Sequence, residues 1–90
     1  SEYIKEIVLS NKEVVYNLYK INHVYLYGSY SKGLETKYSD IDLLIQADDL
    51  PGDTLKQILA FYNAIFEIPV DVHSIEKEEK FVGFSPELIY

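Results

Sequence analysis

The chain has 90 residues, of which 48% are hydrophobic and 26% are charged, a composition typical of a globular domain. Its 15 acidic residues outnumber its 8 basic residues, and the net charge of −7 disfavours a nucleic acid partner. It contains no cysteine, which excludes disulfides and zinc–thiolate sites and agrees with a reducing cytoplasm.

No apolar stretch approaches the roughly 20 residues that cross a bilayer. We therefore expect a cytoplasmic protein without a membrane partner. The length predicts one domain over residues 1–90, and the acidic charge favours a basic partner protein or a substrate carried by a metal ion.

The first predicted element is a helix. Apolar residues recur at steps of three and four, which predicts one apolar stripe over about four turns. The stripe consists of Ile4, Ile7, Val8, Val14, Val15 and Leu18. The pattern ends at Ile21-Asn22, and the helix is expected to end there.

Two strands and a loop follow. Residues 23–27 are β-branched and aromatic and stop at Gly28, which predicts a buried strand. Residues 29–39 are polar and include Gly33, so we expect a loop with at most one helical turn. Residues 40–46 predict a second strand.

A second long helix is predicted after the turn at residues 48–52, with Asp53 as its N-cap. Its apolar stripe consists of Leu55, Ile58, Leu59, Tyr62, Ile65 and Phe66. Pro69 then precedes a third strand at residues 70–75. These elements predict an α/β (α+β) fold, a small three-stranded mixed sheet with packed helices.

The tail gives a weaker pattern. Residues 76–80 form a charge cluster that we expect to be solvated, and Ser85-Pro86-Glu87 is typical of a helix start. The apolar residues of the tail need cover from the rest of the chain. They are Phe81, Val82, Phe84, Leu88 and Ile89.

Asp40 and Asp42 are the first candidate site residues. Side chains alternate along a strand, so both carboxylates point to one face and repel each other unless a cation lies between them. Carboxylate oxygens are suitable ligands for Mg²⁺, and water and phosphate oxygens complete its coordination shell. The alternative is that Asp40 ends a loop and Asp42 is a solvated edge residue.

Asp71 of the third strand adds a third carboxylate. If that strand lies beside the second, Asp71 reaches the face of Asp40 and Asp42, and three converging carboxylates are typical of a two-metal phosphoryl-transfer site. Gly28 lets the backbone approach a phosphate, Ser29 can donate hydrogen bonds to it, and Lys32 adds positive charge. His73 faces the same site, as a ligand, a proton relay or a hydrogen-bonded rim residue.

The motif Gly28-Ser29, Gly33, Asp40-Ile41-Asp42 and a later Asp71 resembles the nucleotidyltransferase fold of the DNA polymerase β superfamily. The similarity is greatest to its smallest members, the minimal nucleotidyltransferase (MNT) domains, and it covers nearly the whole chain. Many relatives carry arginine where Lys32 stands, and lysine binds phosphate as a point charge without arginine's bidentate geometry.

The resemblance implies roles for these residues. Asp40 and Asp42 would bind two Mg²⁺ ions, and Asp71 would complete the second metal's shell beside the attacking hydroxyl. Gly28 and Ser29 would hold the terminal phosphates of the nucleotide, with Lys32 near them. The catalytic set is thus Asp40, Asp42 and Asp71.

The resemblance also implies a setting. Many bacterial members are antitoxins that transfer AMP from ATP to a tyrosine of a HEPN-family toxin, which would be the partner here. Two alternatives remain: an antitoxin that neutralises its partner by binding alone, and the catalytic part of a small-molecule enzyme similar to aminoglycoside nucleotidyltransferases.

Overall fold

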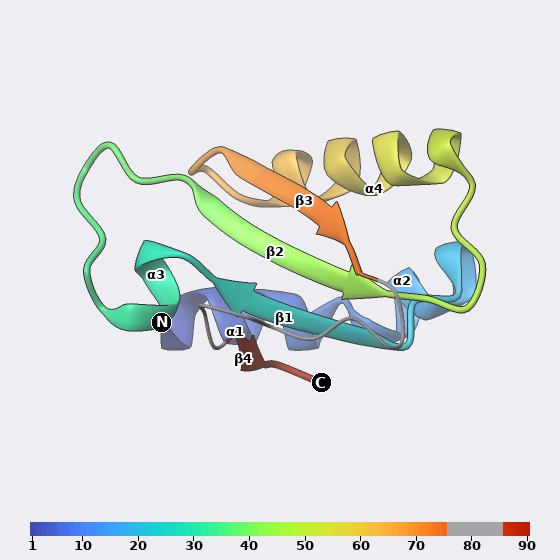
Figure 1. Cartoon of the computed structure of the whole chain (residues 1–90), viewed down its shortest axis with the longest axis horizontal. Coiled ribbons are helices and arrows are strands. Elements are labelled where there is room, and N and C mark those ends of the chain that lie inside the picture. The colour runs from blue at the N-terminus through green and yellow to red at the C-terminus, as the bar shows by residue number, and fades with distance from the viewer. Residues whose placement is uncertain (76–85) are drawn as a thin grey trace.

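The computed structural model describes residues 1–75 and 86–90. In these ranges a mixed sheet of four strands is covered on one face by helices (Figure 1). The helices are α1 (Glu2–Ser10), α2 (Lys12–Tyr19), α3 (Ser29–Lys32) and α4 (Gly52–Ile65). The strands are β1 (His23–Tyr27), β2 (Ile41–Gln46), β3 (Val70–Ser74) and β4 (Glu87–Leu88). The expected charge cluster at 76–80 and residues 81–85 lie outside the described ranges.

The strand order in the sheet is β3-β2-β1-β4. β1 pairs with β2 and with β4 in antiparallel orientation, whereas β2 and β3 are parallel. Parallel neighbours need a long crossover, and α4 provides it between β2 and β3. The predicted mixed α+β fold is confirmed, but the sheet has a fourth strand, β4, where three strands were expected. The loop at 29–39 contains the single helical turn that the sequence allowed.

The core lies between the sheet and the helices, which Figure 1 shows behind it. Alternation along β2 buries Ile41, Leu43 and Ile45 completely on this side. The other strands and the helices complete the core with Ile4, Val8, Val15, Val24, Leu26, Ile58, Tyr62, Phe66, Val70 and Val72. None of the helices within the described ranges is long and apolar enough to span a membrane.

The predicted single N-terminal helix is wrong, because the chain breaks at Asn11 into α1 and α2. Ser10 Oγ donates to the carbonyl of Glu6 at 2.7 Å, and Asn11 Nδ2 donates to the carbonyl of Ile7 at 2.8 Å. Such side-chain bonds compete with the helical backbone pattern. Because α2 is a separate helix, its apolar residues do not continue the buried face of α1, and Val14 and Leu18 are exposed at 47% and 61%.

Two predicted ends also differ from the structure. α4 begins at Gly52 with Pro51 as its N-cap, so Asp53 lies in the first turn, where its charge favours the helix dipole. Glu87 does not start a helix, because Glu87 and Leu88 form β4 beside β1. Glu87 also forms an ion pair with Lys5 of α1, which ties this strand to the helical layer.

Asn63 of α4 fixes the start of β3. Its Oδ1 accepts a hydrogen bond from the backbone N–H of Val70 at 2.9 Å, and its Nδ2 donates to the carbonyl of Val70 at 2.8 Å. β3 is at the edge of the sheet, so a side chain here replaces the missing neighbouring strand. The clamp orders the backbone immediately before Asp71.

We expect Asn63→Ala to lower the free energy of unfolding by about 1–3 kcal/mol, because both backbone groups of Val70 lose their partner. Urea denaturation measures this change. Asn17→Ala is the matched control, since Asn17 is an exposed residue of helix α2, and it should change stability by no more than about 0.5 kcal/mol. Equal effects of the two substitutions would contradict the clamp.

Candidate active site

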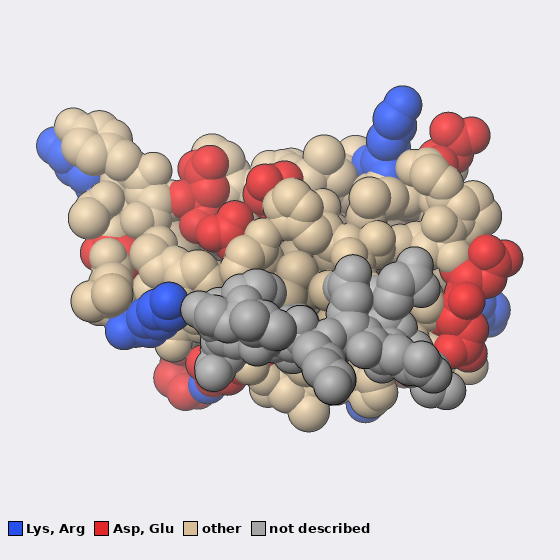
Figure 2. Space-filling view, viewed as in Figure 1, with Lys and Arg blue, Asp and Glu red and all other residues tan. Residues whose placement is uncertain are grey.

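Three side chains form a row across the sheet, on the face opposite the helices. Tyr27 of β1 pairs with Asp42 of β2, and Asp42 pairs with Asp71 of β3. Side chains at paired positions point to the same face of a sheet, so the carboxylates of Asp42 and Asp71 are direct neighbours. Figure 2 shows acidic side chains gathered over the beginnings of β2 and β3.

Asp42 is the electrostatic centre of this row. Its side chain is half-buried, and this burial raises the pKa of its carboxyl above the ordinary value. The charge of Asp71 raises the pKa further, His73 opposes the rise, and Asp40 adds to it. The ionised form of Asp42 is therefore destabilised in the folded protein, and a bound cation would stabilise it.

His73 contacts the row from one position further along β3. Its Nε2 lies 3.2 Å from Oδ2 of Asp71, and its ring centroid is 6.1 Å from that of Tyr27 in an edge-on arrangement. Burial and the charges of Asp42 and Asp71 raise the pKa of the Tyr27 phenol. The sequence placed Tyr27 only within the predicted strand at residues 23–27, although its position directly before Gly28 could have indicated the site.

Asp40 lies one residue before β2, not inside it as predicted, and its side chain is exposed. Within residues 1–75 and 86–90, no three Asp, Glu, His or Cys side chains converge closely enough to hold a metal ion by themselves. Mg²⁺ needs only one or two protein carboxylates when water and phosphate oxygens complete its shell. The hard, mutually repelling oxygens of Asp42 and Asp71 fit such a metal–nucleotide complex.

Gly28 brings the turn after β1 directly against Asp42. A Cβ at Gly28 would lie 2.5 Å from Oδ2 of Asp42, closer than real Cβ atoms come to their neighbours, so the Asp42 carboxylate would have to move. The backbone of Gly28 has φ 75° and ψ −156°, a region that essentially only glycine adopts. Both observations require glycine here, and they place the turn beside the carboxylate row.

Ser29 and Lys32 belong to α3, which starts at this turn. Ser29 is half-buried next to Gly28, and the single-turn helix ends at Gly33, whose left-handed φ of 70° reverses the chain. Lys32 is exposed in the last turn, and among the described residues it forms no ion pair. The structure thus joins Gly28 and Ser29 to the acidic row and leaves Lys32 at the end of α3.

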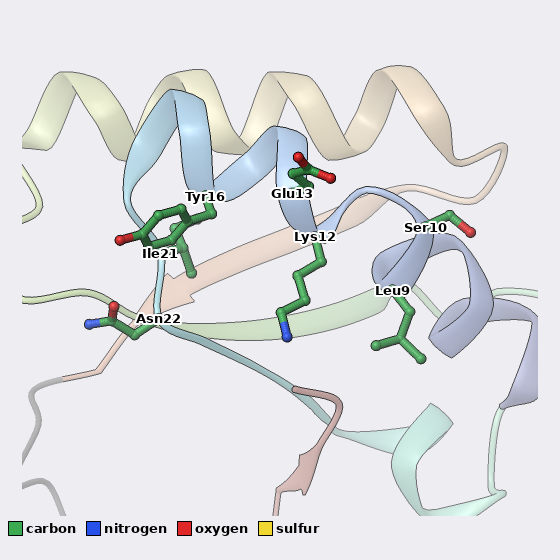
Figure 3. A pocket seen from close by; sticks show the side chains of 7 residues that line it. All are labelled: Leu9, Ser10, Lys12, Glu13, Tyr16, Ile21 and Asn22. Carbon is green, nitrogen blue, oxygen red and sulfur yellow. The ribbon is translucent and has the colours of Figure 1, made fainter.

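A cavity of about 660 Å³ lies elsewhere, between α1, α2 and the segment before β1 (Figure 3). Its lining consists of Leu9, Ser10, Lys12, Glu13, Tyr16, Ile21 and Asn22. None of the predicted site residues lines it, and its single carboxylate and single amine do not form a cluster of reactive groups. We therefore assign the candidate site to the acidic row.

We expect Gly28→Ala to lower the free energy of unfolding by about 3 kcal/mol, from backbone strain and overlap with Asp42 together. Gly33→Ala is the matched control, because its φ is also positive but nothing lies within 4 Å of the added Cβ. It should cost about 1–2 kcal/mol. Adding Asp42→Ala to Gly28→Ala should restore part of the loss, and strictly additive effects in urea denaturation would contradict the overlap.

The raised pKa of Asp42 predicts a pH-dependent stability. The folded state holds the Asp42 proton more tightly than the unfolded state, so this carboxyl destabilises the fold as pH rises through its raised pKa. Asp42→Asn should therefore stabilise the protein near pH 7, by about 0.5 kcal/mol after solvent screening. The gain should shrink near pH 4. Urea denaturation at both pH values measures this, and a gain that does not shrink would contradict it.

Comparison with known proteins identifies the family to which the chain belongs. Residues 3–89 match the family model described as the nucleotidyltransferase domain. A Methanocaldococcus jannaschii protein named "Putative protein adenylyltransferase MJ1379" is 30% identical over 86 residues, which are 96% of this chain and 73% of that protein.

Two further M. jannaschii proteins carry the same name with the designations MJ0126 and MJ1215. They are 34% and 32% identical over 71 residues, which are 77% of this chain and 71% and 81% of theirs. No solved structure gives a significant match. The family match over residues 3–89 and the fold together show that the chain belongs to the nucleotidyltransferase family, as an enzyme of the minimal nucleotidyltransferase type.

Proposed function

We propose that this protein transfers AMP from ATP to a tyrosine hydroxyl of a partner protein, a HEPN-family toxin, and thereby acts as its antitoxin in the cytoplasm. One observation carries the chemistry: Asp42 and Asp71 are direct neighbours in the sheet, and Gly28 lies against Asp42. The names of the relatives support a protein as the acceptor and AMP as the transferred group.

The charge distribution supports a metal–triphosphate substrate. Burial and then the negative charges of Asp71 and Asp40 raise the pKa of Asp42, and these carboxylates would repel a free triphosphate. Bound Mg²⁺ would turn the repulsion between the carboxylates and the triphosphate into attraction. Two Mg²⁺ ions would neutralise the phosphates and acidify the attacking hydroxyl. Asp40 and Asp42 would bind both ions, and Asp71 would complete the coordination shell of the second ion.

The remaining roles follow from position. The backbone N–H groups and hydroxyl at Gly28-Ser29 would hold the terminal phosphates, with the charge of Lys32 at the end of α3. Asp71, the outermost carboxylate of the row, accepts the proton of the acceptor hydroxyl. The hydroxyl oxygen forms its bond to the α-phosphorus as the bond from that phosphorus to pyrophosphate breaks, and pyrophosphate leaves with the electron pair.

Neutralisation by binding alone is the second candidate function. It is favoured by apolar side chains that stand exposed on α1 and α2, namely Leu9, Val14, Tyr16 and Leu18. Leu9 and Tyr16 line the same cavity, and exposed apolar side chains that lie together are typical of surfaces that contact another protein. The two functions share a partner and differ in whether the acidic row is needed.

The test is transfer of label from α-labelled ATP, with Mg²⁺, to the protein encoded beside this one. We expect a labelled partner with the wild type, and a loss of more than about 100-fold with Asp40→Asn/Asp42→Asn, because the metal ligands are then neutral. Chelation of Mg²⁺ should abolish the transfer, and excess unlabelled ATP should compete more strongly than GTP.

Asp48→Asn/Asp49→Asn is the matched control. It makes the same change of charge on two exposed aspartates that follow the other end of β2, and it should leave transfer unchanged. A partner that binds both double variants equally well and never takes up label would contradict the proposal and favour binding alone.

A further inference from the structure

His73 is a histidine that family resemblance does not assign. It lies two residues after Asp71 on β3, so both side chains point to the face of the sheet opposite the helices. Its Nε2 lies 3.2 Å from Oδ2 of Asp71, and the two side chains are 53% and 57% exposed. A ring with this much access to water can turn away, so its orientation toward Asp71 needs a second contact.

Tyr27 provides that contact. His73 of β3 pairs with Leu44 of β2, and Tyr27 of β1 pairs with Asp42 of β2. The two rings are therefore diagonal neighbours on either side of β2. Their centroids are 6.1 Å apart with an interplanar angle of 66°, an edge-on geometry that aromatic pairs prefer. The imidazole is thus held between Tyr27 and Asp71, which are the two neighbours of Asp42 in the row.

A carboxylate on an exposed strand has several rotamers, and only some of them turn an oxygen toward Asp42. A hydrogen bond to one oxygen selects among these rotamers and leaves the other oxygen for a ligand. Metal sites in proteins use such partners to orient their ligands, and loss of one typically costs 10–100-fold in metal affinity or activity.

We propose that His73 is a positioning residue for Asp71: it donates the Nε2 proton to Oδ2, with its ring supported by Tyr27, and so leaves Oδ1 to serve the metal and the acceptor hydroxyl. This inference rests on the proposed function. A neutral imidazole with its proton on Nε2 is sufficient, so the role requires no change of charge during the reaction.

The test measures binding of Mn²⁺ alone to the purified protein by titration calorimetry, at a slightly alkaline pH, without nucleotide or acceptor. We expect His73→Ala to weaken Mn²⁺ binding by about tenfold, and His73→Gln to stay within about threefold of the wild type because its amide can also donate to Asp71. His23→Ala is the matched control, since His23 of β1 points to the same face of the sheet as His73 and is also exposed. It should bind as the wild type does.

Transfer kinetics give the second readout. His73→Ala should lower kcat by about tenfold with little change in KM for ATP, because Asp71 would act through the second metal and the acceptor hydroxyl, whereas Gly28 and Ser29 would hold the phosphates of the nucleotide. Circular dichroism confirms that each variant is folded, and His73→Gln keeps the test valid if His73→Ala is not.

The outcomes separate the two hypotheses. Unchanged or tighter Mn²⁺ binding by His73→Ala, equal losses in His73→Ala and His73→Gln, or an equal loss in His23→Ala would each overturn the positioning role. A wild type that binds no Mn²⁺ would overturn it as well. If the wild type binds Mn²⁺ but transfers no AMP, the proposed function fails, and the affinities of the variants still decide whether His73 orients Asp71.

Discussion

The carboxylate of Asp42 sets the constraint on which the rest of the site depends. It has Gly28 against one side and Asp71 beside it in the next strand, and it is half-buried. A negative charge in this position is costly for the folded chain when nothing positive is bound. The fold therefore keeps two carboxylates close together on one face, an electrostatic arrangement that is common at functional sites.

Each part of the site derives its place from the pairing of three strands. Gly28 directly follows the end of β1, and Asp42 lies near the beginning of β2. Asp71 lies on β3 at the position that pairs with Asp42. A slip of one residue in either pairing would move a carboxylate to the buried face. The fully buried Ile41 and Leu43 on either side of Asp42 prevent such a slip, because it would expose them to water. Core packing and site geometry are thus the same constraint.

Local patterns in the sequence predicted much of this arrangement. The alternation in residues 40–46 gave the face of Asp42, and the glycine after an aromatic strand gave the turn. The break at Asn11, strand β4 and the contact of His73 with Asp71 were not predictable in this way. The first depends on side-chain bonds to the helical backbone, and the others depend on neighbours that lie far apart in the sequence or on a rotamer. The catalytic roles of Asp40, Asp42 and Asp71 remain predictions.

The clamp of Asn63 on Val70 has a consequence for how a partner protein can approach. An edge strand normally offers its free N–H and C=O groups to an added strand, as in β-augmentation or aggregation. Here the outward groups of Val70 are already bonded to a side chain of α4, at the end of β3 that carries Asp71. A polypeptide cannot extend the sheet at this position without displacing Asn63. If the acceptor is a protein, as proposed, its backbone would not pair with this end of β3, and a side chain would reach the acidic row from the face opposite the helices.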